Sequence, residues 1–237
     1  MAVLVTRPHP DNEATARALR ERGFEVVLAP MLRIEQIPLG EELGRDFTGV
    51  IATSANALRA VEAELGAFTA LPLYAVGDHT AAEARRLGFA KVISAAGDGA
   101  KLGRLVRKGA KGRKLLYLAG AELARDLAAE LGADGFDVIR RTTYRMVALS
   151  RLSRESCAAF AANDVEAVLH YSQRSARAFL EAARRDGVEI SALAVPQCCI
   201  SANVAAILHE AGAVQVLSAP SPDENALFGA LERALRP

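Results

Sequence analysis

The chain has 237 residues, of which 51% are hydrophobic and only 5% aromatic, and its formal net charge at pH 7 is +1. This length suits two small domains, and such a composition is typical of α/β cores. The near-zero charge excludes the electrostatic attraction behind strong non-specific nucleic-acid binding, and no apolar run approaches the roughly 20 residues of a membrane helix. We therefore expect neither a nucleic-acid nor a membrane partner.

The first 30 residues predict a strand, a helix and a second strand. Val3–Val5 is a short apolar run, and Pro10 leads a helix over Glu13–Arg22 that Gly23 ends. Continuously apolar strands that alternate with helices indicate a parallel sheet covered on both faces. Because the chain enters a strand at once, with no basic stretch or apolar signal core, we expect a cytoplasmic protein.

The next two segments extend this pattern. Residues 49–107 alternate strands and helices from Val50 onward, and residues 114–141 again read as strand, helix, strand. Gly23-Phe24-Glu25-Val26-Val27 of the first segment is echoed by Gly135-Phe136-Asp137-Val138-Ile139. The segment 114–141 is therefore a second copy of the first module.

The last segment, residues 167–233, repeats residues 49–107. Val50–Ala57 returns as Val168–Ser175, and Ala75–Ala82 returns as Cys199–Ala206 with the same spacing to a following glycine and strand. With residues 1–30 as module A and residues 49–107 as module B, the four modules run in the order A, B, A′, B′. The final helix has a capping box, Ser221-Pro222-Asp223-Glu224, that predicts Ser221 as its N-cap.

This module order predicts two similar lobes, each an α/β doubly wound, flavodoxin-like parallel sheet. Residues 38–142 form one contiguous lobe, and residues 1–32 with 150–237 form a discontinuous lobe, with crossing segments at 31–38 and 142–149. A two-lobed protein has a cleft, and clefts bind ligands.

The turns after the predicted strands are small and rich in hydroxyls. Helices that start there place free backbone N–H groups at the carboxyl edge of the sheet, an arrangement suited to carboxylates or phosphates. Taken singly, residues such as Ser54, Thr80 and Ser172 could equally be ordinary helix N-caps. The turns comprise Thr6-Arg7-Pro8, Thr53–Asn56, Gly77–Thr80, Gly120–Glu122, Tyr171–Arg174 and Ser201–Asn203.

Dedicated catalytic and metal-binding motifs are missing. The sequence contains no phosphate-binding G-x-x-x-x-G-K-[ST] loop, no G-x-G-x-x-G, no G-x-S-x-G and no paired-histidine helix. A phosphoacceptor receiver domain needs clustered acidic residues after its first strand, where Thr6-Arg7 stands instead. The cysteines Cys157, Cys198 and Cys199 read as free thiols, and we expect no metal site and no cofactor.

The same turns carry a resemblance that extends over almost the whole chain. The opening V-L-V-T-R-P, the S-A-N-A turn at Ser54, A-V-G-x-x-T-A at Ala75, Thr143-Tyr144-Arg145 and H-Y-S-x-R-S-A at His170 occur in an order and spacing that resemble the uroporphyrinogen-III synthase family. The resemblance implies an enzyme of tetrapyrrole (heme) biosynthesis. Such a lyase takes linear hydroxymethylbilane, removes its terminal hydroxyl as water, inverts the last pyrrole ring and closes the macrocycle without a cofactor.

The resemblance also implies site residues. It makes Met31–Pro38 and Thr142–Leu149 a two-stranded ladder between the lobes, and it makes Tyr144 the proton donor to the departing hydroxyl, since a phenol stays protonated at neutral pH. For the carboxylates of the substrate we expect contacts from turn residues of both lobes and from nearby arginines. These are Arg7, Ser54, Ala55, Asn56, Gly77, Thr80, Arg145, Ser172, Arg174 and Ser201.

Two alternatives remain open from sequence. One is a noncatalytic two-lobed α/β protein that binds a polycarboxylate ligand, and the other is a small α/β transferase, although no nucleotide loop supports it. The second lobe departs from the family pattern, with Asn203-Val204-Ala205 at a position where Thr-Ala is common and His170-Tyr171 at a frequent Phe-Thr. No extended apolar surface is evident, so we expect a monomer.

Overall fold

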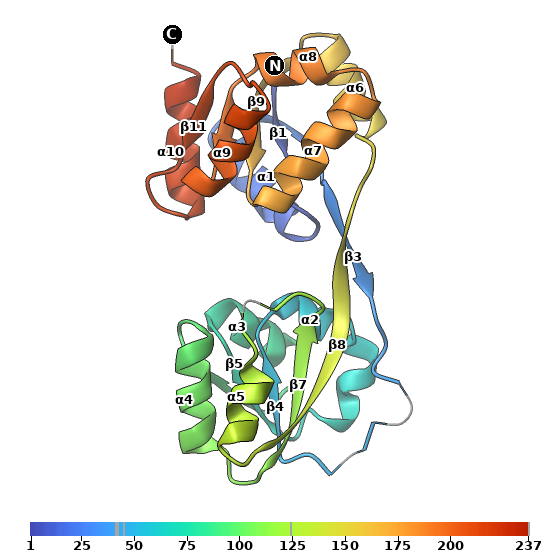
Figure 1. Cartoon of the computed structure of the whole chain (residues 1–237), viewed down its shortest axis with the longest axis vertical. Coiled ribbons are helices and arrows are strands. Elements are labelled where there is room, and N and C mark those ends of the chain that lie inside the picture. Colours follow the sequence, from blue (N-terminus) through green and yellow to red (C-terminus); the bar gives the residue numbers. More distant parts are fainter. Residues whose placement is uncertain (41–42, 45, 124, 237) are drawn as a thin grey trace. The chain divides into compact units, whose positions relative to one another are not determined.

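The computed structural model describes residues 1–40, 43–44, 46–123 and 125–236. The chain divides into two compact units, Met1–Ile34 with Val147–Pro237 (unit 1) and Glu35–Met146 (unit 2). Each unit holds one sheet whose strands alternate along the chain with helices (Figure 1). The predicted α/β class with parallel sheets is confirmed.

The sheet of unit 1 has the strand order β11-β10-β9-β1-β2, and every neighbouring pair is parallel. Its strands are β1 (Ala2–Val5), β2 (Glu25–Leu28), β9 (Val165–His170), β10 (Gln197–Cys199) and β11 (Val216–Ser218). Its helices are α1 (Asp11–Arg20), α6 (Arg154–Ala161), α7 (Gln173–Arg185), α8 (Glu189–Ala194), α9 (Ala202–Glu210) and α10 (Glu224–Ala234).

The sheet of unit 2 has the order β3-β8-β7-β4-β5-β6, and the pairs from β8 to β6 are parallel. Its strands are β3 (Leu32–Gln36), β4 (Gly49–Ala52), β5 (Pro72–Ala75), β6 (Lys91–Ser94), β7 (Lys114–Gly120) and β8 (Asp137–Ala148). Its helices are α2 (Ala55–Arg59), α3 (Asp78–Arg86), α4 (Gly99–Gly109), α5 (Leu127–Ala133) and the 3₁₀-helix η1 (Glu62–Ala67).

The two sheets arrange the repeated strands in the same spatial order. In unit 1, β2-β1 lies beside β9-β10-β11, and in unit 2 the equivalent pair β8-β7 lies beside β4-β5-β6. Unit 1 therefore has the flavodoxin-like strand order 2-1-3-4-5. Read in the same direction and without β3, unit 2 has the order 5-4-1-2-3, because its modules come in the opposite sequence along the chain. The repeated glycines Gly23 and Gly135 both adopt left-handed backbone, with φ of +87° and +82°.

Both faces of each sheet are buried, as continuously apolar strands require. In β4, Val50 and Ala52 pack into one core of unit 2, and Ile51 between them packs into the core on the opposite face. In β1, Val3 and Val5 face one core of unit 1, and Leu4 faces the other. This alternation follows from the period of two in a strand, and the helices on each side supply the covering layers.

The strands β3 and β8 contain the two points at which the chain passes from one unit to the other, and they are hydrogen-bonded neighbours. The Ile37 N–H donates to Thr143 O at 2.7 Å, and the Leu149 N–H donates to Met31 O at 2.9 Å. Residue numbers rise along one strand as they fall along the other, so the pairing is antiparallel. Figure 1 shows β8 as the long strand that enters unit 2 beside β7.

The predicted cap of the last helix is wrong by two residues. The N-cap of α10 is Asp223, whose carboxylate accepts the Ala226 N–H at 2.9 Å. The Ser221 hydroxyl instead donates to the Asp223 carboxylate. An anion at the positive helix end is stabilised by the helix dipole, and Ser221 orients that anion.

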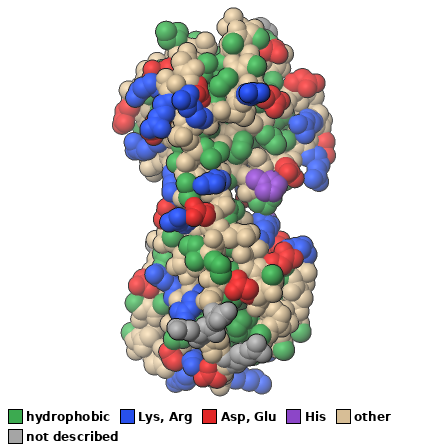
Figure 2. All heavy atoms as spheres, turned by 90° about the vertical axis from the view of Figure 1, so that its right-hand side faces the viewer, with side chains coloured by type: hydrophobic (Ala, Val, Ile, Leu, Met, Phe, Trp, Pro, Cys, Tyr) green, Lys and Arg blue, Asp and Glu red, His purple; other side chains and the backbone are tan. Residues whose placement is uncertain are grey.

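Charges of both signs are interspersed over the face of each unit that Figure 2 shows. Many of the described arginines lie in ion pairs, for example Arg107 with Asp134 and Arg151 with Asp186. Within the part of the chain that the structure describes, every helix is too short or too polar to cross a lipid bilayer.

Candidate functional site

The turn after β4 begins the candidate site in unit 2. Strand β4 ends at Ala52, Thr53 follows, and Ser54 has extended backbone and caps α2. The Ser54 Oγ accepts the Asn56 N–H at 3.2 Å, which fixes the rotamer of this side chain. The carboxyl end of a central parallel strand therefore presents two adjacent hydroxyls, those of Thr53 and Ser54.

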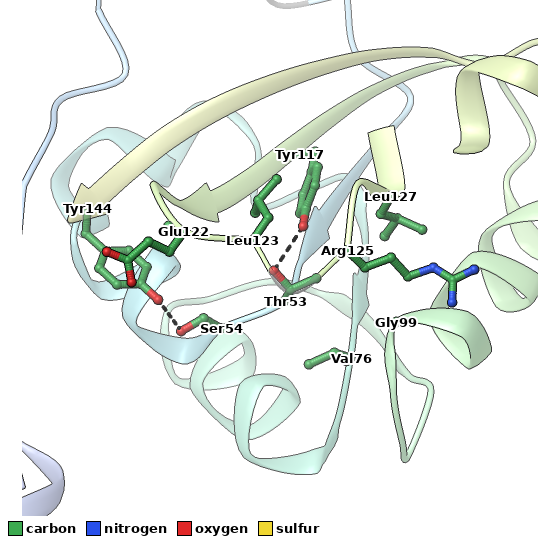
Figure 3. A pocket seen from close by; sticks show the side chains of 11 residues that line it. Thr53, Ser54, Val76, Gly99, Tyr117, Glu122, Leu123, Arg125, Leu127 and Tyr144 are labelled. Carbon is green, nitrogen blue, oxygen red and sulfur yellow. Dashed lines mark hydrogen bonds between the residues drawn. The ribbon is translucent and has the colours of Figure 1, made fainter. Parts of the chain in front are cut away.

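Tyr144 reaches this turn from β8. The register between β7 and β8 shifts between Ala119 and Gly120, so that Gly120 lies opposite Tyr144, and the Ala121 N–H donates to Tyr144 O at 2.9 Å. The phenol hydroxyl of Tyr144 then donates to Ser54 Oγ at 3.2 Å (Figure 3). Two residues 90 positions apart in sequence thus form one hydroxyl pair, and both were predicted as site residues.

A second phenol–hydroxyl pair lies in the same region. The Tyr117 hydroxyl of β7 is 3.2 Å from Thr53 Oγ1 (Figure 3). The Tyr117 side chain is buried, and this burial raises the pKa of its phenol, although the hydrogen bond to Thr53 opposes the rise. Tyr117 is therefore a neutral hydrogen-bonding group at neutral pH.

The two pairs line a pocket of about 260 Å³ that lies entirely in unit 2. Polar walls come from the two phenols, the two hydroxyls and the charged residues Glu122 and Arg125, and apolar walls come from three aliphatic side chains (Figure 3). The full lining is Thr53, Ser54, Val76, Gly99, Tyr117, Gly120, Glu122, Leu123, Arg125, Leu127 and Tyr144. Such a cavity can hold part of an apolar ring and offer it hydrogen-bond donors.

The remaining predicted residues of unit 2 lie outside the lining of this pocket. Ala55 is buried in the first position of α2, and Asn56 accepts a hydrogen bond from Arg59 at 3.0 Å. Gly77 caps α3 through its backbone alone, and Thr80 is buried as the third residue of that helix rather than forming its N-cap. Arg145 is exposed on β8 and pairs with Glu35 of β3 at 2.6 Å.

In unit 1, the structure surrounds Arg7 with carboxylates. Its guanidinium is 3.2 Å from Glu224 Oε1 and 3.3 Å from Asp11 Oδ2, and it stacks on the Tyr171 ring at 4.9 Å. The Tyr171 hydroxyl also donates to Glu224, and burial, followed by this carboxylate, raises the pKa of the phenol. Two carboxylates against one guanidinium leave a local excess of negative charge.

The other predicted residues of unit 1 lie at helix starts. Ser172 caps α7, accepting the Ser175 N–H at 3.0 Å, and its hydroxyl is 2.7 Å from the Ser175 hydroxyl. Arg174 is the second residue of α7, and Ser201 caps α9 with no side-chain hydrogen bond to that helix. Ser172 and Ser201 stand where Ser54 and Gly77 stand in unit 2, as the repeat requires.

Sequence reasoning missed Tyr117 and Arg125 as pocket residues, and it placed Glu122 in a candidate turn without naming it as a site residue. The available signal for Tyr117 was a hydroxyl inside the apolar run Leu115–Leu118, three residues before the last residue of the strand, Gly120. A polar atom at that position needs a partner, and Thr53 supplies it. No pattern in the sequence indicated that the Tyr117 hydroxyl would meet Thr53.

Comparison with known proteins identifies the family. The family model described as uroporphyrinogen-III synthase HemD matches residues 13–229. The chain belongs to the uroporphyrinogen-III synthase family. This membership confirms the predicted activity, a cyclising lyase of tetrapyrrole biosynthesis that converts hydroxymethylbilane to uroporphyrinogen III, and it does not favour the noncatalytic alternative. Among curated proteins, none matches the chain significantly in sequence.

Solved structures agree on the fold. The uroporphyrinogen-III synthetase of Helicobacter pylori is 20% identical and matches with a TM-score of 0.65 over 99% of each chain. A mutant uroporphyrinogen III synthase of Thermus thermophilus is 17% identical, with a TM-score of 0.52 over 99% of this chain and 98% of that one. At these identities the likeness concerns the fold, so the roles of individual residues must be argued from the site itself.

Proposed function

We propose that the pocket of unit 2 carries the acid–base chemistry of the synthase reaction, with Tyr144 as the source of the proton that removes the hydroxyl of hydroxymethylbilane. The observation that supports this role most directly is the hydrogen bond of 3.2 Å from the Tyr144 hydroxyl to Ser54 at the wall of the pocket. The bond holds an acidic proton at a fixed place beside a space that a pyrrole ring can occupy.

The chemistry needs only a modest acid. A hydroxymethyl group on an electron-rich pyrrole leaves when its oxygen is protonated, because the pyrrole nitrogen supplies electrons to the carbon left behind. General acids contribute about 10²–10⁴ in rate, and a leaving group already assisted by the ring nitrogen needs less. The larger task is to hold both ends of the bilane in a folded pose, for which orientation supplies about 7–11 kcal/mol.

The substrate is a polycarboxylate, whereas the protein is nearly neutral. We propose that backbone amides and hydroxyls at the strand ends share its recognition with arginines, the candidates being Ser54, Ala55, Asn56, Gly77, Thr80, Ser172, Ser201, Arg145 and Arg174. Arg7 is left out of this proposal, because Asp11 and Glu224 already compensate its guanidinium. Ser201 has support from its free side chain at a helix start, since it makes no capping bond. We further propose that the protein acts as a cytoplasmic monomer.

The product isomer tests the function. Hydroxymethylbilane is generated in the assay, the purified protein is added without metal or nucleotide, and the oxidised type I and type III uroporphyrins are separated chromatographically. Predominantly type III uroporphyrin is the expected result, because spontaneous closure proceeds without ring inversion and yields type I. Type I product at the rate of the protein-free control would exclude the activity.

A further inference from the structure

The hydrogen bonds at Ser54 account for both of its acceptor positions. The Ser54 Oγ accepts the Asn56 N–H at 3.2 Å and the Tyr144 O–H at 3.2 Å. A hydroxyl has two acceptor lone pairs and one proton to donate. The proton of Ser54 is therefore the group that remains, and none of the described residues accepts it in the structure.

The hydroxyl of Tyr144, in contrast, has no proton left to donate to a ligand. Its single hydroxyl proton is directed at Ser54 and so is not available to a ligand in the pocket. Ser54 is half-buried, lies on the pocket wall and is held in one rotamer by its cap. The proton that stays available to a ligand in the pocket therefore belongs to Ser54, and Tyr144 is the acid that is hydrogen-bonded to Ser54.

We propose that Ser54 is a catalytic residue of this synthase and that Tyr144 acts through it, the two forming a proton relay. This inference rests on the proposed role of Tyr144. Ser54 hands its proton to the hydroxyl oxygen of hydroxymethylbilane, and the Tyr144 proton moves to Ser54 Oγ.

The step is balanced over one turnover. The C–O bond breaks with its electron pair on oxygen, which leaves as water, and the pyrrole nitrogen lone pair stabilises the positive charge left on the carbon. Tyr144 is left as phenolate. Inversion of the last ring breaks the C–C bond between that ring and its methylene, and two new C–C bonds form, one at each α-carbon of the ring. When the second of these bonds closes the macrocycle, the α-carbon that carried a hydrogen loses its proton, which returns through Ser54 and restores the phenol. Water is the only species released.

Conservative variants at Ser54 separate proton transfer from positioning. Ser54→Thr keeps both the cap and a hydroxyl, and we expect it to retain kcat within about threefold. Ser54→Asn also caps a helix and offers an oxygen to the Tyr144 O–H, but its amide is not an acid. We expect Ser54→Asn, Ser54→Ala and Tyr144→Phe each to lower kcat by about 10- to 300-fold.

A double variant and a proton inventory complete the test. Because Ser54 and Tyr144 act as one unit, Ser54→Ala combined with Tyr144→Phe should lose no more than about threefold beyond either single variant. In mixtures of light and heavy water, kcat of the wild type should depend on the deuterium fraction with the curvature of two transferred protons. Ser153→Ala is the matched control for a lost cap, since Ser153 caps α6 by accepting the Ser156 N–H at 3.0 Å.

The outcomes distinguish this inference from the proposed function. If the wild type makes only type I product, the function fails, and if Tyr144→Phe is as active as the wild type, the role of Tyr144 fails. If Tyr144→Phe is impaired while Ser54→Asn stays within threefold of the wild type, or if the inventory is linear, the relay alone is overturned. Thermal unfolding of each variant shows whether a loss of activity reflects a loss of folded protein.

Discussion

The aromatic ring of Tyr144 lies directly against the α-carbon of Gly120. A methyl group built on Gly120 would be 2.8 Å from Tyr144 Cζ and 3.0 Å from the Tyr144 hydroxyl oxygen. Real side-chain carbons almost never approach other heavy atoms this closely, so one of the two groups would have to move. The absence of a side chain at Gly120 is therefore what allows the phenol to reach Ser54.

Gly120→Ala should displace the Tyr144 ring and lower kcat by as much as we expect for Tyr144→Phe, about 10- to 300-fold. The measurement is the rate of type III product formation, together with the melting temperature. Gly132→Ala is the matched control, because Gly132 lies in α5 of the same unit with nothing within 4 Å of the added carbon. Activity of Gly120→Ala close to that of the control would show that the ring position is unimportant.

Tyr117→Phe should behave differently from Tyr144→Phe, although both remove a phenol hydroxyl from the pocket. The Tyr117 hydroxyl contacts Thr53 and is buried, so its loss leaves Thr53 without that partner and should lower the free energy of unfolding by about 1 kcal/mol. We expect kcat to fall less than about fivefold, against 10- to 300-fold for Tyr144→Phe. Urea unfolding and steady-state kinetics of the two variants provide the comparison, and equal losses of kcat would make Tyr117 a catalytic residue.

Arg7→Ala should affect stability more than substrate binding. The variant leaves Glu224 and Asp11 without their cation, and we expect the free energy of unfolding to fall by about 1–2 kcal/mol. Because two carboxylates already compensate the guanidinium, KM should rise less than about threefold. A rise of KM by tenfold or more in a stably folded variant would instead support a direct contact between Arg7 and the substrate carboxylates.

His170 gives unit 1 a pH-dependent stability. Its Nε2 is 2.9 Å from Gln197 Oε1, and Gln197 Nε2 donates to the carbonyls of Ala192 and Val195. Gln197 Oε1 is therefore an acceptor, which makes His170 Nε2 the donor and leaves Nδ1 buried without a partner among the described residues. Burial lowers the pKa of His170 to about 4, although the bond to Gln197 opposes the shift.

Stability should therefore fall as the pH is lowered from about 6.5 towards 4. In this window the unfolded histidine binds a proton that the folded one excludes. Between pH 7 and pH 5 the free energy of unfolding should fall by about 2 kcal/mol. Urea unfolding at these two pH values measures it. His170→Leu should lose this part of the pH dependence, whereas His79→Gln at an exposed position should keep it. An unchanged dependence in His170→Leu would assign the effect to other groups.

The fold follows from the sequence to a large extent because its signals are local or repeated. The echo of Gly23–Val27 in Gly135–Ile139 predicted equivalent strands, and both glycines have the left-handed backbone that ends a helix at this point. Continuously apolar strands predicted sheets buried on both faces, as Val50, Ile51 and Ala52 show. The cap at Asp223 in place of Ser221 shows the limit of such patterns, because either residue satisfies the sequence rule.

The sequence by itself determined the order of the modules and the sheet class, because periodicity and repeated motifs can be recognised along the chain. Its resemblance to the family also predicted Ser54 and Tyr144 as site residues, and their roles stay predictions. Only the tertiary structure decided that Tyr117 meets Thr53, that Gly120 makes room for the phenol and that Arg7 is neutralised by Glu224. These relationships join residues up to 217 positions apart. Their distances depend on strand order and side-chain packing, which no local pattern of residues specifies.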